Sequence, residues 1–323
     1  MKVFITGATG LIGSEISKQL IDQGHELVAI HRQNSSLELV EHIQNKIEWH
    51  EADLFDTELL YDIIETADYV IHCAGIISEG DIDSMYKVNI EGTANIVNIA
   101  LETNVKKMIH LSSIAAIGKT KDQSLITEST KWEEGHQNSK YGESKMLGER
   151  EVWRGIAEGL SAVILNPSVV LGVGNGYSGS SAILPLLAKG PKRYLPGATG
   201  FVDVRDVARI AIKALSSEIE NQRYVISGYN KSFRSLMTDA STQLNTNPPT
   251  APLSIGALRL MGSIDAIVSF FLRRHRKLTK TSIMQATRSL SYDNAKSKKD
   301  FGFEYTEWEK TIERICKPYR LSS

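Results

Sequence analysis

Short apolar runs alternate along the chain with stretches whose apolar residues recur every three or four positions. Runs of this kind indicate buried strands, and the recurring spacing between them indicates helices with one apolar face. The strand-like runs lie at 2–5, 26–30, 47–50, 69–75, 107–111, 161–165 and 224–227. Helical patterns follow at about 11–21, 56–65, 82–102 and 139–157, with a further helix that ends at Leu215. This rhythm predicts an α/β fold, a doubly wound parallel sheet with helices on both faces.

The composition and the hydrophobic pattern of the sequence change after Pro167. Residues 172–179 are rich in glycine, a short helix is expected at 180–189, and the part from about residue 231 onward is rich in helical patterns broken by prolines. We therefore expect a larger domain from residues 1–167, completed by a return segment at 201–228. Residues 168–200 and 229–323 would form a smaller, helix-rich portion that binds the substrate.

One largely apolar stretch at 254–272 precedes five basic or histidine residues at 273–277. Its length suits a membrane span, but Arg259 and Asp265 near its middle argue against one. We expect a helix packed in the smaller portion, with surface contact to a membrane or partner through 254–277 as the second interpretation.

Composition narrows the function classes. The chain has 323 residues, 41% of them hydrophobic, and a formal net charge of -1, so a nucleic-acid partner is not expected. Its two cysteines, Cys73 and Cys316, are far apart, which argues against a disulfide framework or a metal site and fits a reducing, cytoplasmic location. The apolar run after Met1 is too short for a signal peptide.

Three glycines lie at the junction between the first strand and the first helix. Gly7, Gly10 and Gly13 are spaced by three, directly after the strand at 2–5 and before the helix. Glycine there permits a tight turn, close approach of a pyrophosphate to backbone N–H groups, and close packing of helix on strand. The sequence therefore predicts a Rossmann-type dinucleotide-binding loop.

The end of the second strand bears on which dinucleotide binds. An acidic residue there would hydrogen-bond the adenosine ribose of NAD, but this strand runs into His31-Arg32-Gln33. A guanidinium at this place suits a 2′-phosphate, so NADP(H) is favoured and NAD(H) remains the alternative.

Candidate residues far apart in the sequence follow the carboxyl ends of different strands. In a parallel sheet these ends meet at one edge, where ligands bind. Asp53, Gly75, Ser113 and Asn166 would thus lie beside the glycine loop and Arg32.

Tyr141 and Lys145 lie four residues apart, so on a helix they share one face. The ammonium of Lys145 would favour the phenolate form of Tyr141, whose ordinary pKa is too high for acid–base work at neutral pH. A tyrosine tuned in this way suits the interconversion of a carbonyl and an alcohol.

Together these residues resemble the extended short-chain dehydrogenase/reductase family, also called the NAD-dependent epimerase/dehydratase superfamily. The matching elements are Thr6–Gly13, Ala52-Asp53-Leu54, Val88-Asn89, Ser112-Ser113, Tyr141–Lys145, Asn166-Pro167 and Phe201–Ala208. The resemblance implies Tyr141 as acid/base, Lys145 as the group that tunes it, Ser113 as the hydroxyl that holds the carbonyl oxygen, and a supporting role for Asn89. It also implies a homodimer formed through the helices at 82–102 and 139–157.

The implied cofactor contacts come from the loops after the strands. They are Gly7, Thr9, Gly10, Leu11, Ile12, Gly13, Arg32, Asp53, Leu54, Ala74, Gly75, Tyr141, Lys145, Asn166, Pro167 and Ser168.

Within the family, the sequence looks closer to the branch similar to dihydroflavonol reductases and hydroxysteroid dehydrogenases. Ala115 and Ala116 follow the serine where epimerases usually have a hydroxyl residue, and Thr199-Gly200-Phe201 lacks the arginine that helps epimerases hold a diphosphate. The leading hypothesis is an NADP(H)-dependent oxidoreductase that reduces a ketone or aldehyde, or oxidises the secondary alcohol. The alternatives are a nucleotide-sugar epimerase/dehydratase that retains NAD, and a non-catalytic NADP-binding protein.

Overall fold

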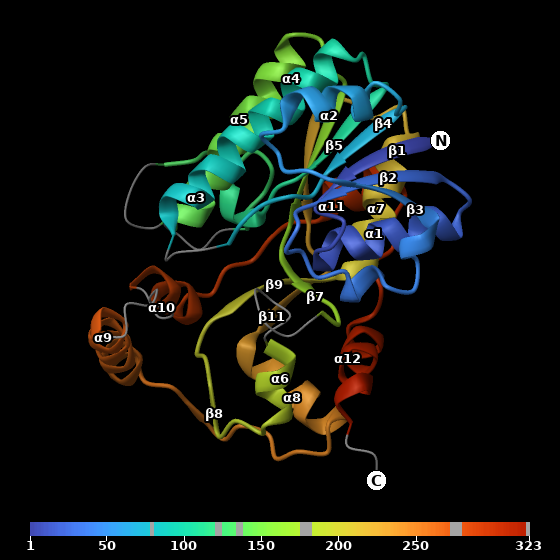
Figure 1. The fold of residues 1–323 in the computed structure, drawn as a ribbon. Helices are drawn as coiled ribbons and strands as arrows, with labels where there is room; N and C mark the ends of the chain where they lie inside the picture. Colours follow the sequence, from blue (N-terminus) through green and yellow to red (C-terminus); the bar gives the residue numbers. More distant parts are fainter. Residues whose placement is uncertain (78–80, 120–124, 134–137, 175–182, 272–279, 321–323) are drawn as a thin grey trace.

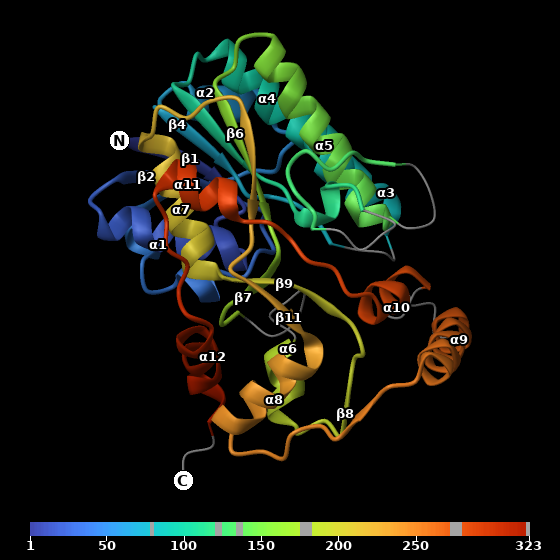
Figure 2. The same ribbon diagram turned by 180° about the vertical axis from the view of Figure 1, so that it is seen from behind.

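The structure is a computed structural model and describes residues 1–77, 81–119, 125–133, 138–174, 183–271 and 280–320. It has two lobes, which lie one above the other in Figures 1 and 2. The large lobe is built around one broad sheet, and the small lobe holds two short sheets and several helices.

Seven parallel strands form the sheet of the large lobe. They are β1 (Lys2–Thr6), β2 (Glu26–His31), β3 (Ile47–Glu51), β4 (Tyr69–His72), β5 (Lys107–Leu111), β6 (Ala162–Pro167) and β10 (Gln222–Ile226). Their order is β10-β6-β5-β4-β1-β2-β3, and each neighbouring pair is parallel. The order reverses beside β1, so the edge above β1 and β4 is where a ligand crevice is expected. The predicted α/β fold is confirmed.

Alternating side chains of each strand build two separate apolar layers. Val3 and Ile5 of β1 join one layer, and Phe4 between them joins the other. On the first face lie α1 (Leu11–Asp22), α7 (Val204–Ser216) and α11 (Ala295–Phe301), and on the second α2 (Thr57–Ile64), α4 (Thr93–Glu102) and α5 (Lys140–Ala157). Because both faces are covered, the strands read as continuous apolar runs, which is why the sequence pattern located them.

The helix expected at 82–102 is present but divided. It consists of α3 (Ile82–Tyr86), a π-helical segment η3 (Lys87–Gly92) and α4. π-Helical turns inside α-helices are rare and often mark functional sites. Asn89 lies in the middle of this segment.

The small lobe is assembled from segments on both sides of β10. Its strands β7 (Val169–Leu171), β9 (Ala198–Asp203) and β11 (Tyr229–Ser232) form one sheet, and β8 (Arg193–Tyr194) pairs with β12 (Ala251–Pro252). Its helices are α6 (Ile183–Ala188), α8 (Phe233–Gln243) and α12 (Trp308–Cys316). Phe201, Leu236 and Trp308 meet in its core. Residues 180–182 of the helix expected at 180–189 lie outside the described part.

Four short 3₁₀ turns complete the described secondary structure. They lie at Glu38–Val40, Gln44–Lys46, Ile114–Ala116 and Lys317–Tyr319.

Two helices stand apart from the rest of the small lobe. α9 (Ile255–Phe271) and α10 (Lys280–Thr287) lie beside each other, away from α8 and α12 in both views (Figures 1 and 2). In the described residues no helix has both the length and the apolar character that crossing a bilayer needs. The basic residues at 273–277 lie outside the described part, so the surface contact expected through 254–277 stays a prediction.

The chain returns from the small lobe to the large one before it ends. α11 packs against β10 and α7, and Phe301 and Phe303 belong to the apolar layer that contains α1. This stretch of 229–323 therefore lies with the large sheet, whereas the sequence pattern grouped it with the smaller portion.

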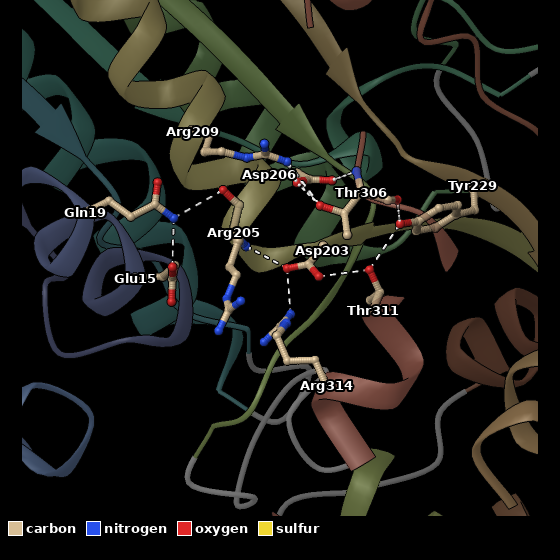
Figure 3. Close-up of polar contacts among 10 residues, drawn as sticks. All are labelled: Glu15, Gln19, Asp203, Arg205, Asp206, Arg209, Tyr229, Thr306, Thr311 and Arg314. Atoms are coloured by element: carbon tan, nitrogen blue, oxygen red, sulfur yellow. Dashed lines mark hydrogen bonds and ion pairs between the residues drawn. The ribbon is translucent and has the colours of Figure 1, made fainter. Parts of the chain in front are cut away.

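Buried carboxylates fasten the lobes together at the start of α7 (Figure 3). Asp203 is fully buried, pairs with Arg314 of α12 at 2.6 Å and accepts a hydrogen bond from Thr311 at 2.9 Å. Asp206, one turn later, accepts hydrogen bonds from the backbone N–H of Thr306 at 2.8 Å and from its hydroxyl at 2.7 Å. Since a buried charge is stable only when paired, these contacts fix α12 against α7.

Candidate active site

The glycine loop lies where β1 ends and α1 begins. Gly7 has a φ of +69°, and a Cβ added to it would lie 2.7 Å from the backbone nitrogen of Ala74. A Cβ on Gly13 would lie 2.2 Å from the carbonyl oxygen of Gly7. Glycine is thus required at both places, by conformation at the first and by close packing at the second.

The beginning of α1 is left open for an anion. Gly10 is its exposed N-cap residue, and no side chain caps the helix. The first N–H groups of a helix attract phosphate when they have no internal partner. The loop and helix therefore fit the pyrophosphate of a dinucleotide, with Thr9, Leu11 and Ile12 around it.

A cavity of about 420 Å³ lies at the ends of β2 and β3, beside this loop. It is lined by Arg32, Gln33, Asn34, Glu51, Ala52, Asp53 and Asp56. Asp53 and Asp56 brace the turn: Asp56 accepts from the backbone N–H of Asp53 at 2.7 Å, and Asp53 accepts from that of Phe55 at 2.7 Å. Leu54 is buried below. The predicted Arg32 and Asp53 thus come together.

Two lining residues, Glu51 and Asp56, were not singled out from the sequence. Glu51 ends β3 directly before Ala52-Asp53, so its place at the sheet edge could have indicated it. Three carboxylates face the same cavity as the Arg32 guanidinium.

The candidate catalytic hydroxyls meet at the other end of the sheet edge. Ser139 caps α5 by accepting from the N–H of Gly142 at 3.0 Å, which starts the helix one residue before Tyr141. Ser113 follows β5, and its Oγ accepts from the N–H of Ala115 at 3.1 Å. The Ser113 hydroxyl lies close enough to the Tyr141 phenol to lower its pKa.

Lys145 is buried below this pair. It is only 4% exposed, and its Nζ donates to the carbonyl oxygen of Leu111 at 2.8 Å. Burial lowers the pKa of Lys145 to about 8, partly offset by the negative charge of Glu149. Gly75 lies beside it, since a Cβ there would be 3.6 Å from Nζ.

The pKa of Tyr141 differs from the sequence-based expectation. Burial raises it above its ordinary value, and the nearby Ser113 hydroxyl offsets only part of this rise. The expected lowering by Lys145 is not found, because the ammonium is directed to the Leu111 carbonyl and desolvation of the phenol dominates. Tyr141 therefore keeps its proton at neutral pH.

Asn89 organises the surroundings of this pair. Its Oδ1 accepts from the N–H of Ile76 at 2.8 Å, and its Nδ2 donates to the carbonyl of Ile76 at 3.0 Å and to Ser144 Oγ at 2.9 Å. Ser144 Oγ in turn donates to the carbonyl of Tyr141 at 2.8 Å. The side chain of Asn89 is fully occupied, which fits the predicted supporting role.

Asn166 and Ser168 follow β6 on the same edge. Asn166 Nδ2 donates to the carbonyl of Ser113 at 2.8 Å and contacts Glu149 Oε1. Asn166 Oδ1 and Ser168 Oγ are buried, and neither has a hydrogen-bond partner among the residues that the structure describes. Buried polar atoms are normally satisfied, so these two fit a polar ligand group such as a cofactor amide.

Glu149 is a site residue that the sequence analysis missed. It is 2% exposed, and it accepts from Ser112 Oγ at 2.6 Å and pairs with Arg223 Nη1 at 3.1 Å. Its position four residues after Lys145 puts it on the same helix face, and that spacing was the available signal.

Comparison with known proteins agrees with this geometry. A family model described as the NAD dependent epimerase/dehydratase family matches residues 3–227. A putative dihydroflavonol 4-reductase from Synechocystis is 24% identical, over 93% of this chain and 89% of its own. Cinnamoyl-CoA reductase 2 from Arabidopsis thaliana is 30% identical, over 69% of this chain and 72% of its own.

Among solved structures, a UDP-glucose 4-epimerase from Thermotoga maritima superposes with a TM-score of 0.80 at 19% identity, covering 99% of both chains. At this identity the likeness supports the fold alone. The family match extends over most of the chain and includes every expected motif. The chain therefore belongs to the NAD-dependent epimerase/dehydratase family and is an NAD(P)-dependent oxidoreductase of the extended short-chain dehydrogenase/reductase type.

Proposed function

We propose that this protein is an NADP(H)-dependent reductase of a ketone or aldehyde with an apolar body. The observation that carries the proposal is the Ser113–Tyr141 pair above the buried Lys145, beside the unsatisfied atoms of Asn166 and Ser168. A bound dinucleotide would supply the hydride that reduces the carbonyl carbon. The protein's own residues bind the substrate oxygen and deliver its proton.

Tyr141 acts as the proton donor in this scheme. Burial raises its pKa, so the phenol is protonated at neutral pH and gives its proton to the oxygen as negative charge develops there. Ser113 Oγ already accepts from Ala115, so its own hydroxyl hydrogen is available for the same oxygen. Lys145 is held by the Leu111 carbonyl and does not lower the pKa of Tyr141, so its role in this scheme is to bond the nicotinamide ribose of a bound dinucleotide.

The preference for NADP(H) rests on Arg32. Its guanidinium borders the cavity of about 420 Å³, and β2 ends without a carboxylate. Glu51, Asp53 and Asp56 border it too and would repel a 2′-phosphate that Arg32 did not neutralise. The preference should therefore depend on this one arginine.

An apolar substrate is supported by the resemblance to the branch that contains dihydroflavonol reductases. Ile77, Leu125 and Val173, which come after β4, β5 and β7 in the sequence, are 65%, 49% and 37% exposed and would be available to an apolar ligand. Two relatives are named as reductases, which agrees with this proposal.

Tyr141→Phe is the test of the mechanism. Loss of the proton donor should lower turnover on a panel of aldehydes and ketones by roughly a hundredfold to ten-thousandfold. The dissociation constant of NADPH, measured by calorimetry, should stay within about twofold. Tyr61→Phe on α2 is the matched control and should keep full activity. Ordinary turnover in Tyr141→Phe would remove Tyr141 from the mechanism.

Arg32→Ala tests the cofactor assignment. In the unaltered protein NADPH should bind more tightly than NADH, and the variant should lose that difference, because a charge-assisted contact to the phosphate disappears. A preference for NADH in the unaltered protein would overturn the role of Arg32.

The second candidate is a nucleotide-sugar epimerase that retains NAD. The three carboxylates at the cavity beside Arg32 favour it, because a carboxylate there suits the ribose hydroxyls of NAD. Release of tightly bound NAD from freshly purified, denatured protein, with epimerisation that consumes no added cofactor, would support it over the reductase.

We further propose a cytoplasmic homodimer joined through α4 and α5, as the resemblance implies. Trp153 on α5 is 36% exposed and would be covered there. Light scattering on the purified protein, with Trp153→Glu alongside, tests this arrangement: a monomer in both would contradict it.

A further inference from the structure

A chain of hydrogen bonds runs beneath the candidate site, from Ala74 to Asn89. The backbone N–H of Ala74 donates to Thr6 Oγ1 at 3.1 Å, and Thr6 Oγ1 lies 2.7 Å from His72 Nδ1. His72 Nε2 lies 3.1 Å from Thr93 Oγ1, which donates to the carbonyl of Asn89 at 2.8 Å. The three side chains between the two ends are at most 1% exposed.

The direction of this chain follows from the number of protons available. The Thr93 hydroxyl has one proton and gives it to the Asn89 carbonyl, so Thr93 Oγ1 accepts the proton of His72 Nε2. Nδ1 of the same ring is then an acceptor and receives the Thr6 hydroxyl proton. Burial lowers the pKa of His72 to about 3, so the ring stays neutral and this one tautomer persists.

The two ends of this chain of hydrogen bonds belong to the two functional halves of the site, the cofactor side and the side of the proton donor. Ala74 packs against Gly7 of the glycine loop, on the cofactor side. Asn89 belongs to the π-helical segment, and its side chain is bonded to Ile76 and to Ser144 below Tyr141. His72, on β4, is in contact with a hydroxyl from each half, Thr6 Oγ1 and Thr93 Oγ1.

We infer that His72 is a positioning residue, which holds the cofactor loop at 73–76 through Thr6 and the Asn89 segment through Thr93. The inference rests on the function proposed above, since it assigns the two ends to cofactor binding and to the proton donor. Each arm then has its own effect. The Thr6 arm controls how tightly the dinucleotide binds, and the Thr93 arm controls turnover through the helix that carries Tyr141.

His110 provides a matched control within the same layer. It is paired with His72 across β4 and β5, its ring stacks on that of His72 with centroids 5.3 Å apart, and both side chains are 0% exposed. Unlike those of His72, its ring nitrogens have no hydrogen-bond partner within the described part of the protein. Replacing His110 therefore changes the packing of the layer without breaking the chain of hydrogen bonds from Ala74 to Asn89.

Four variants of the full chain separate the arms: Thr6→Val, Thr93→Val, His72→Leu and His110→Leu. Valine keeps the shape of threonine but loses its hydroxyl, and leucine has nearly the volume of histidine, so thermal unfolding checks that each variant still folds. A net hydrogen bond corresponds to about a fivefold change in an equilibrium. Thr6→Val should weaken NADPH binding about fivefold with kcat kept, and Thr93→Val should do the reverse. His72→Leu should do both, and His110→Leu neither.

Amide hydrogen exchange on the protein without cofactor gives a readout that needs no turnover. The backbone N–H of Ala74, which donates to Thr6 Oγ1, should exchange faster in Thr6→Val and His72→Leu, and the amides of 87–92 faster in Thr93→Val and His72→Leu. If the unaltered protein reduces no carbonyl, the proposed function fails while this pattern still tests the positioning role. Equal effects of His72→Leu and His110→Leu would show a packing effect and overturn the inference. Unchanged exchange and binding in both valine variants would overturn it as well.

Discussion

The buried pair of Glu149 and Arg223 supports a quantitative prediction, tested by Glu149→Gln. Glu149 is 2% exposed and accepts from Ser112, Asn166 and Arg223, whose side chain is 22% exposed. Glutamine keeps an acceptor for the two neutral donors but turns N–H groups toward the guanidinium. Removing one partner of a buried pair costs about 3 to 5 kcal/mol, and the partial exposure of Arg223 places this case near 3.

Urea unfolding followed by tryptophan fluorescence would measure this cost as a fall in the free energy of unfolding. Arg223→Met should cost about as much, because it leaves the Glu149 carboxylate buried without its counter-charge. The double variant should lose about 2 kcal/mol less than the sum of the single losses, since the two groups interact.

A surface pair on the same helix supplies the control. Arg154 and Glu158 are 2.6 Å apart on α5, but their side chains are 36% and 50% exposed, so Arg154→Met should cost less than about 1 kcal/mol. Two results would refute the reasoning about burial. One is that the losses of free energy of unfolding in Glu149→Gln and Arg223→Met add up exactly in the double variant. The other is that either single loss is no larger than that of Arg154→Met.

Three further outcomes are expected. Burial lowers the pKa of His72 from 6.5 to about 3. As the pH falls through 6.5, the His72 ring therefore becomes protonated in the unfolded protein but stays neutral in the folded one. The contribution of this group should lower the free energy of unfolding by about 2 kcal/mol between pH 7 and pH 5. His72→Leu should lose that part of the pH dependence when the free energy of unfolding is measured across this pH range. Gly13→Ala should abolish NADPH binding in calorimetry, since its Cβ would lie 2.2 Å from the Gly7 carbonyl; retained affinity would show that the loop can shift. Asp203→Asn removes the counter-charge of Arg314, which is as exposed as Arg223, and should lower the free energy of unfolding by about 3 kcal/mol; an unchanged urea midpoint would contradict this.

Local patterns located most of the large lobe and its candidate site. Each buried strand is a short apolar run with glycine or polar residues at its end, and such signals depend only on neighbours in sequence. The seven-stranded parallel sheet and the shared edge of Arg32, Asp53, Ser113 and Tyr141 follow from the rule that ligand loops succeed the strand ends.

Contacts between distant residues account for what the sequence did not reveal. The spacing from Lys145 could place Glu149 on the same helix face, but its pairing with Arg223, 74 residues later, could not be predicted from that spacing. The π-helical segment within 82–102 depends on how Asn89 packs against α5, because no local residue pattern encodes it. The pKa of Tyr141 rose because burial, a property of the whole fold, outweighed its neighbour one helical turn away.

The late return of the chain to the large sheet bears on how this protein is made. A ribosome adds about 5–20 residues per second, so roughly 7 to 27 seconds separate the synthesis of Pro167 from that of Phe303. In the first part of that interval β6 is an edge strand, because its neighbour β10 comes from residues 222–226, and until the end of the interval Phe301 and Phe303 have not yet covered their apolar layer. An exposed apolar edge invites pairing with another chain. The yield of folded protein should therefore depend on chaperone protection of the growing chain, and less on the stability of the finished fold.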